Sequence, residues 1–250
     1  MLLGIDWMIE WLNDWMSEWV NEWMIEFSWI FLNFLEFSWH LTSSSIQVNS
    51  FTVVNKPTFI QYLQNGLELN FMVAIDFTGS NGSPSDPSSL HYCNPSLYSQ
   101  GVYNQYEKAI LYVGRVLEYY DKDKLFPCYG FGACLDNSRT ASQCFALNRN
   151  ENDPNVFGIQ GIMDIYHNTI STVRFSGPTL FENILQKANQ YCTVVQPSLN
   201  QYLVLLIITD GEIHDMENTI QQICYGADLP LSVLIVGVGN SDFSNMEVRF

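Results

Sequence analysis

The 250-residue sequence is poor in basic residues, with 10 Lys and Arg against 26 Asp and Glu and a formal net charge of −16. Nucleic-acid binding requires a basic face that neutralises phosphates, and unaided binding to anionic lipid requires positive charge as well. The composition therefore argues against both functions. Any association with a membrane surface is expected to run through partner proteins.

Long apolar runs are also missing. The stretch from Phe27 to Leu35 carries no charge but is far shorter than the ~20 residues that a transmembrane helix needs. A basic start followed by an uninterrupted apolar centre, which would mark a secretory signal, is absent as well. We expect no membrane span and a cytoplasmic location, peripheral at the plasma membrane only through partners.

The six cysteines and four histidines show no metal-ligand spacing. A domain of this size needs no disulfide framework, so buried or half-buried free thiols in a reducing compartment are expected. We expect His91 to pack or hydrogen-bond in the loop after the first strand, and His214 to lie at the surface or at a helix start. The alternative for His214, which comes four residues after Asp210, is an approach to the opening of a metal site there. Neither histidine is assigned a catalytic role.

Residues 1–44 differ from the rest of the chain. Acidic residues recur at every fourth position from Asp6 to Glu26, tryptophan follows each of the first five, and Lys and Arg are absent. A period of 4.0 drifts around a helix of 3.6 residues per turn, so the tryptophans do not share one face. We interpret this segment as a low-complexity leader, helical or disordered, with docking on a partner or on the sheet as the alternative.

Three apolar runs predict the strands of a buried sheet. Residues 69–75, 202–208 and 231–239 are too short for membrane spans and rich in branched and aromatic residues, which predicts strands buried on both faces. Apolar residues at helical spacing occur over residues 103–120, 158–172, from Thr179 onward and over 215–227. This alternation predicts a Rossmann-like α/β fold, a doubly wound and mostly parallel sheet with helices on both faces.

Carboxylates and hydroxyls directly follow two of these runs. Asp76-Phe77-Thr78-Gly79-Ser80 follows the first and Thr209-Asp210-Gly211 the second, while Gly177-Pro178-Thr179 precedes a helix. In doubly wound sheets the ligand site lies beyond the strand ends, where strand order reverses. Oxygen ligands of this kind suit Mg²⁺, and zinc is disfavoured because no Cys or His accompanies the three segments. Turn formation or helix capping remains the alternative for each segment alone.

Taken together, the three segments resemble the metal-ion-dependent adhesion site of von Willebrand factor A domains. Most A domains have Ser where this chain has Thr78, whereas copines have Thr there. From about Ser45 to Met246 the sequence is similar to the A domain of copines. The similarity is carried by residues 73–82, 89–92, 129–133, 207–211 and 235–239.

The resemblance implies a site for Mg²⁺ or Mn²⁺. Asp76 would act on the ion through water or through neighbouring ligands, Thr78 and Ser80 would supply hydroxyl oxygens, Thr179 a switchable hydroxyl and Asp210 the remaining carboxylate. In related A domains the open metal position accepts a carboxylate of a partner protein. The resemblance therefore implies a cytosolic protein-interaction module whose partner supplies an acidic residue.

Two departures from copines limit what the resemblance implies. The calcium- and lipid-binding modules that precede the A domain in copines are not found, so calcium-dependent phospholipid binding is not carried over to this sequence. A domains also continue into one more strand and a closing helix, whereas this sequence stops at Phe250. We therefore expect residues 45–250 to form a C-terminally truncated A domain without the affinity switch, with a bare sheet edge and apolar face.

Two further functions remain as alternatives to a non-enzymatic binding module. The same carboxylates would hold magnesium in an enzyme of phosphoryl transfer or hydrolysis. Against this, the sequence shows no phosphate-binding Gly-x-x-x-x-Gly-Lys loop, no poised base and no nucleophile pair. The other alternative is an inactive fragment of a copine.

Overall fold

The computed structural model describes residues 57–94, 101–136, 138–195, 200–211, 213–241 and 243. The chain divides into two units, residues 1–66 and 67–250. In the first unit, helix α2 (Phe59–Gln64) begins at a capping box in which the Thr58 hydroxyl accepts from the Gln61 N–H and the Gln61 side chain accepts from the Thr58 N–H. The tryptophan-rich leader predicted for residues 1–44 lies outside the described residues.

The second unit is built around a mostly parallel sheet with the strand order β4-β2-β1-β7-β8. β1 pairs in parallel with β2 and β7, and β7 pairs in parallel with β8, whereas β4 and β5 pair antiparallel with β2. The strands are β1 (Glu68–Asp76), β2 (Leu125–Phe131), β4 (Phe145–Ala146), β5 (Asn155–Phe157), β7 (Gln201–Thr209) and β8 (Leu231–Gly237). Because β2 and β7 flank β1 on opposite sides, the strand order reverses between β1 and β7.

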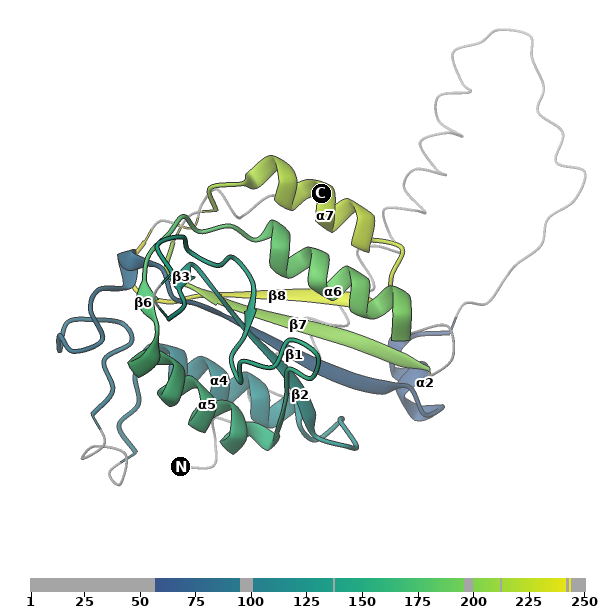
Figure 1. Cartoon of the computed structure of the whole chain (residues 1–250). Coiled ribbons are helices and arrows are strands. Elements are labelled where there is room, and N and C mark those ends of the chain that lie inside the picture. Colours follow the sequence, from purple (N-terminus) through teal and green to yellow (C-terminus); the bar gives the residue numbers. More distant parts are fainter. Residues whose placement is uncertain are drawn as a thin grey trace, which may run out of the picture. The chain divides into compact units, whose positions relative to one another are not determined.

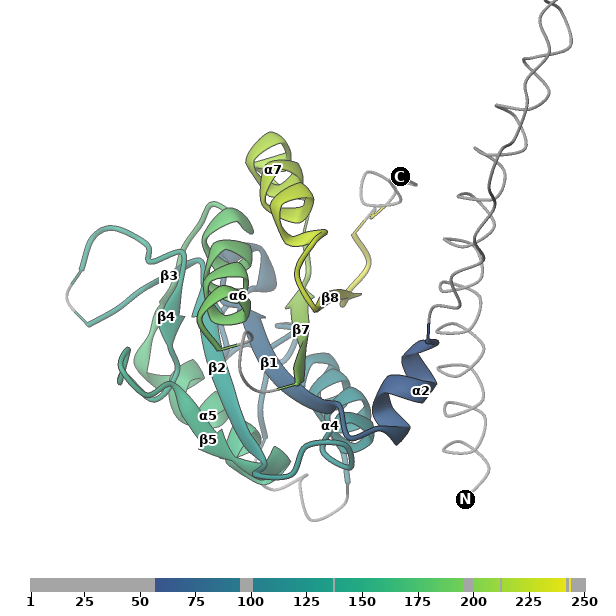
Figure 2. The same ribbon diagram turned by 90° about the vertical axis from the view of Figure 1, so that its right-hand side faces the viewer.

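Helices cover both faces of this sheet (Figure 1). α4 and α5 lie on one face and α6 and α7 on the other, and the same layers are seen from the side in Figure 2. The helices are α4 (Gln105–Leu117), α5 (Gly158–Thr172), α6 (Glu182–Val195) and α7 (Met216–Gly226). Within the described ranges, no helix is both long and apolar enough to cross a membrane.

The central strands are apolar throughout because both of their faces are buried. Successive side chains of β1 alternate between two cores. Val73 and Ile75 pack in the core that includes α4 and α5, whereas Met72 and Ala74 pack in the core that includes α6. The predicted fold class, a doubly wound and mostly parallel α/β sheet with helices on both faces, is confirmed.

Two sequence-based expectations were wrong in detail. The run at 231–239 forms β8, but this strand lies at the end of the strand order and its residues are half-buried or exposed rather than buried on both faces. The helix expected from Thr179 begins at Glu182. The reason is a cap from another segment, since the Asp215 carboxylate accepts from the N–H groups of Phe181 at 3.1 Å and Glu182 at 2.9 Å.

The packing of α4 can be tested by two substitutions on the same helix. Ile110 is fully buried, whereas Tyr112 is 55% exposed. We expect Ile110→Ala to lower the free energy of unfolding by about 2–5 kcal/mol, because it removes buried methyl groups and leaves a cavity. Tyr112→Ala should change it by about 0.5 kcal/mol or less. Urea unfolding of both variants checks this, and equal effects would contradict the assigned core face.

Candidate metal centre

The ends of β1 and β7 lie side by side where the strand order reverses. β1 ends at Asp76 and β7 at Thr209, and the last paired residues of the two strands are Ile75 and Ile208. The crevice beyond such strand ends is where doubly wound sheets bind ligands. Strand pairing therefore brings together two predicted segments that lie far apart in the sequence.

The Asp76 side chain is fully buried and joins these two segments. Its Oδ1 accepts a hydrogen bond from the Thr78 N–H at 2.8 Å, and its Oδ2 accepts one from the Thr209 hydroxyl at 2.5 Å. Burial raises the pKa of Asp76 to about 6, although both hydrogen bonds act to lower it. Because both carboxylate oxygens are engaged by protein donors, Asp76 is better placed to act on an ion through water than by direct contact.

Thr78, Ser80 and Asp210 form a chain of oxygens next to Asp76. The hydroxyl oxygens of Thr78 and Ser80 lie 3.0 Å apart, and the Ser80 hydroxyl donates to Asp210 Oδ1 at 2.9 Å. Thr78 and Asp210 are buried, whereas Ser80 is exposed. These oxygens therefore extend from the interior of the sheet edge to solvent.

Thr179 comes from a third segment and lies beside Gly211, the residue after Asp210. Its Oγ1 lies 3.8 Å from the position that a Cβ on Gly211 would occupy. His214 holds this segment in place, because its N–H donates to the Thr179 carbonyl at 3.0 Å and its Nδ1 accepts from the Thr179 N–H at 3.3 Å. Among the described contacts, the Thr179 hydroxyl makes no hydrogen bond to the other four predicted ligands. His214 is exposed, as predicted for a surface histidine.

Two backbone segments hold the Thr78 loop against the sheet end. The Gly79 N–H donates to the Ser176 carbonyl at 2.5 Å, and the Ser176 N–H donates to the Gly132 carbonyl at 3.0 Å. The flanking strands β3 (Ala133–Cys134) and β6 (Arg174–Phe175) pair antiparallel at the end of the sheet where β1 ends (Figure 1). Gly132 has φ +78°, and a Cβ there would lie 2.3 Å from Thr78 Cγ2.

His91 connects the loop after β1 to the sheet and to α5. It is fully buried, with Nε2 2.8 Å from the Asp76 carbonyl oxygen and Nδ1 2.8 Å from the Tyr166 hydroxyl. Its ring stacks on Tyr106 with the centroids 3.9 Å apart, and Tyr106 donates to Asn81 Oδ1 at 2.7 Å. This confirms the expectation that His91 packs and hydrogen-bonds there. Burial lowers the pKa of His91 to about 3.

Two buried carboxylates share this edge of the sheet without a cationic partner. Burial raises the pKa of Asp210, and burial and the charge of Asp210 both raise that of Asp76. Within the part of the chain that the structure describes, neither carboxylate forms an ion pair with Lys, Arg or His. A divalent cation would supply the missing positive charge. The donor set of carboxylate and hydroxyl oxygens fits a hard ion such as Mg²⁺ or Mn²⁺.

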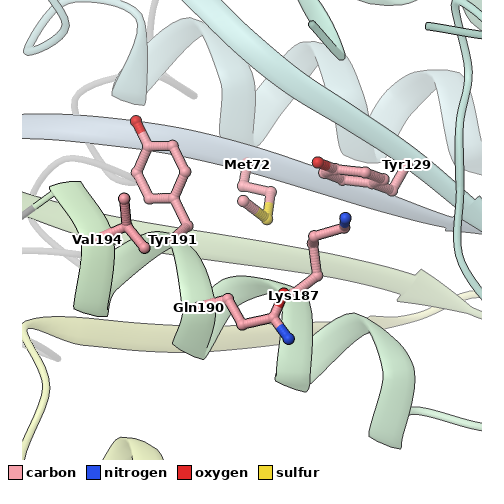
Figure 3. Close-up of a pocket in the computed structure, with 6 residues that line it drawn as sticks. All are labelled: Met72, Tyr129, Lys187, Gln190, Tyr191 and Val194. Atoms are coloured by element: carbon pink, nitrogen blue, oxygen red, sulfur yellow. The ribbon is translucent and has the colours of Figure 1, made fainter. Parts of the chain in front are cut away.

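A pocket of about 220 Å³ lies over the middle of the sheet rather than at the strand ends. Figure 3 shows Lys187 of α6 extending toward Tyr129, with its Nζ 5.6 Å from the ring centre, and Met72 beside them. Met72 lies on β1, about 13 Å along the strand from Asp76. The pocket is therefore separate from the oxygens that converge at the strand ends.

Sequence reasoning missed a second group of potential ligands. Cys93, Glu107 and His167 each offer one ligand atom, and these atoms lie within 4.8 Å of one another. The three residues are too far apart in the sequence to form a recognisable motif, and the packing of α4 against α5 brings them together. All six cysteines are free, and five of them are buried or half-buried as expected, but Cys224 is exposed, so the expectation was wrong for that residue.

Comparison with known proteins finds relatives that match most of this chain. A family model described as Copine matches residues 89–249. Protein BONZAI 2 of Arabidopsis thaliana is 49% identical over 209 residues, which cover 82% of this chain and 34% of that protein. Protein BONZAI 1 of the same plant is 47% identical over 206 residues, with 82% and 35% covered. Copine-A of Dictyostelium discoideum is 40% identical over 212 residues, with 84% and 34% covered.

The matches cover only part of each relative. The chain spans about a third of the length of the curated relatives that it matches. Among solved structures, the crystal structure of manganese-loaded Plasmodium vivax TRAP protein is 11% identical, with a TM-score of 0.42, and the match covers 69% of this chain and 59% of the other. That likeness is too distant to support an inference about this chain.

Acid should destabilise the metal-free protein through His91. Folding lowers the pKa of His91 from 6.5 to about 3, so the unfolded state binds one more proton between these pH values. The stability that this group contributes is complete above about pH 6.5 and is lost as the pH falls toward 3, by up to about 1.4 kcal/mol per pH unit. Urea unfolding between pH 7 and 4 in chelator checks this. His91→Gln should show a shallower slope, and equal slopes would contradict the prediction.

The close contact at Gly132 predicts a second measurable effect. Gly132→Ala should destabilise the protein by more than the about 1–2 kcal/mol expected for a left-handed backbone alone, because the new Cβ would also displace Thr78. Gly101→Ala is the matched control, since Gly101 has φ +70° but nothing within 4 Å of an added Cβ. Urea unfolding measures both variants. An equal cost in the two would show that the Thr78 contact adds nothing.

Proposed function

This chain belongs to the copine family, and we propose that it is a metal-ion-dependent protein-interaction module. A Mg²⁺ or Mn²⁺ ion at the ends of β1 and β7 would bind a carboxylate of a partner protein. The observation that carries the proposal is the pair of buried carboxylates, Asp76 and Asp210, which lie at the reversal of strand order and form no ion pair with a basic residue among those that the structure describes.

The proposed ligand roles follow the surroundings of each side chain. Asp210, Thr78 and Ser80 would contact the ion directly, because their oxygens already form one connected chain. Asp76 would act through water, since both of its oxygens accept hydrogen bonds from protein groups. Thr179 would supply a hydroxyl that joins or leaves the ion. The bound ion contributes positive charge, and the exposed side next to Ser80 would receive the partner's carboxylate.

The proposal includes the setting in which the module acts. The net charge of −16 favours neither nucleic acid nor an anionic membrane as a direct partner. We place the protein in the cytoplasm, with contact to the plasma membrane only through other proteins. Calcium-dependent phospholipid binding belongs to the copine family context and is not assigned to these residues.

Metal binding should be visible as a gain in stability. An ion at about a hundredfold excess over its dissociation constant adds about 2.7 kcal/mol, which corresponds to a rise in unfolding midpoint of about 5–10 °C for a domain of this size. Asp210→Asn should abolish this rise, because it removes a proposed ligand. Asp86→Asn should retain it, since Asp86 is an exposed carboxylate in the same loop. Thermal unfolding in chelator, Mg²⁺ and Mn²⁺ measures the shifts.

The outcomes of this experiment separate the metal from the partner. A rise that persists in Asp210→Asn, or a cooperative transition that neither ion moves, would overturn the proposed site. For partner binding, proteins retained from a cell extract in Mn²⁺ should be lost with chelator and with Asp210→Asn, and kept with Asp86→Asn. Retention that is indifferent to Asp210→Asn would contradict a metal-mediated interaction.

A further inference from the structure

A second group of metal-ligating side chains lies apart from the strand ends. Cys93 lies in the loop after β1, Glu107 in the first turn of α4 and His167 in α5. One ligand atom of each lies within 4.8 Å of the other two. We propose that Cys93, Glu107 and His167 bind a Zn²⁺ ion, which would join this loop to the two helices.

The observed distances suit a zinc ion after small side-chain movements. His167 Nε2 lies 2.6 Å from Glu107 Oε1, and Cys93 Sγ lies 3.9 Å from the same oxygen. With Zn–S bonds of about 2.3 Å and Zn–N and Zn–O bonds of about 2.0 Å, tetrahedral ligand atoms lie about 3.3–3.5 Å apart. Relative to Glu107 Oε1, the thiol would move inward by a few tenths of an ångström and the imidazole outward by less than about 1 Å. The ligand atoms of Cys93 and His167, which lie within 4.8 Å of each other, would come to about 3.5 Å. A fourth position is left for water, as in zinc sites with three protein ligands.

The ligands are oriented by hydrogen bonds that do not depend on the ion. Glu107 has a side chain only 1% exposed, and its Oε2 accepts from the Asn104 N–H at 2.6 Å in the capping box of α4. Its other oxygen, Oε1, is therefore left facing Cys93 and His167. Asn104 Nδ2 also donates to Cys93 Sγ at 3.2 Å. Supporting hydrogen bonds of this kind fix the ligands of protein metal sites.

The ligand types favour zinc over the ions proposed for the strand ends. A thiolate and an imidazole are soft or borderline donors, which suit Zn²⁺ and are poor ligands for Mg²⁺. A pocket of about 320 Å³, lined by Glu107, Asn104 and Tyr92 among others, lies beside the cluster. Cys93 is half-buried and the His167 side chain is 28% exposed, so both can be reached from solvent.

The competing occupant of the cluster is a proton. Burial alone would lower the pKa of His167, but the hydrogen bonds with Cys93 and Glu107 raise it to about 9. The metal-free cluster therefore holds a His167–Glu107 ion pair near neutral pH. Zinc binds a neutral imidazole and a thiolate, so its binding would release the proton of the His167 imidazolium and that of the Cys93 thiol to solvent. The ion would then occupy the place of these two protons. A metal site and a plain ion pair thus differ in a measurable way.

Titration of the full chain with Co²⁺ tests for the thiolate ligand directly. Co²⁺ substitutes for zinc in tetrahedral sites, and a thiolate bonded to it absorbs intensely in the near ultraviolet. We expect this absorption to saturate at one ion per chain and to disappear when Zn²⁺ is added. Cys93→Ser should abolish it, whereas Cys224→Ser, at an exposed cysteine, should leave it unchanged.

Zinc affinity, measured by competition with a chromophoric chelator, provides the second readout. Cys93→Ser and His167→Gln should each weaken binding by about a hundredfold or more, because the loss of even a supporting hydrogen bond costs 10–100-fold. Asp210→Asn should bind zinc as the unsubstituted chain does, which separates this site from the one at the strand ends. The result is thereby independent of the proposed function.

Two results would contradict a zinc site at Cys93, Glu107 and His167. A folded, unsubstituted chain that develops no thiolate–cobalt absorption would overturn it, and so would unchanged zinc affinity in a folded Cys93→Ser variant. Either result would leave the cluster as a His167–Glu107 ion pair. Thermal unfolding in chelator establishes that each variant is folded. If His167→Gln does not fold, Cys93→Ser still decides, because Cys93 is half-buried and lies in a loop.

Discussion

The pairing of β1 with β7 is the interaction on which the rest of the second unit depends. The two strands pair in parallel from Glu68 with Gln201 to Ile75 with Ile208. This register sets which side chains enter each core, and a shift by one residue would turn every side chain to the opposite face. It also aligns the carboxyl ends of β1 and β7, so that the Thr209 hydroxyl reaches Asp76. The core and the candidate metal centre therefore share one register.

The sequence was most informative where a single segment determines its own structure. A strand covered on both faces must be apolar throughout, so the runs ending at Asp76 and Thr209 predicted the two central strands. Because ligand sites in doubly wound sheets lie at strand ends, the same reasoning placed Asp76 and Asp210 together. Their proximity is observed, whereas the binding of an ion remains a proposal.

Features that depend on a distant segment could not be predicted from the sequence. The run at 231–237 is as apolar as the central strands, and only its place in the strand order leaves it half-exposed. The start of α6 depends on a cap from Asp215, which lies in a later segment. The cluster of Cys93, Glu107 and His167 likewise exists only because α4 packs against α5. In each case the deciding contact is tertiary.

The two candidate metal sites are connected through the loop that follows β1. Asn104 Nδ2 donates both to Cys93 Sγ and to the Tyr166 hydroxyl, at 3.2 Å each. The Tyr166 hydroxyl lies 2.8 Å from His91, whose other ring nitrogen lies 2.8 Å from the Asp76 carbonyl oxygen. A hard oxygen site and a softer thiol–imidazole site thus lie at the two ends of one hydrogen-bonded chain.

Asp76 and Asp210 lie far apart in the sequence, so the candidate metal centre can form only after most of the chain has been made. A ribosome adds roughly 5–20 residues per second, so Asp76 is made several seconds before Asp210. Pairing between strands so far apart in sequence is also among the slower events of folding. Until β7 takes its place, Asp76 has neither the Thr209 hydroxyl nor the Asp210 carboxylate beside it. Capture of a cation at this edge would therefore mark a late stage in the maturation of the chain.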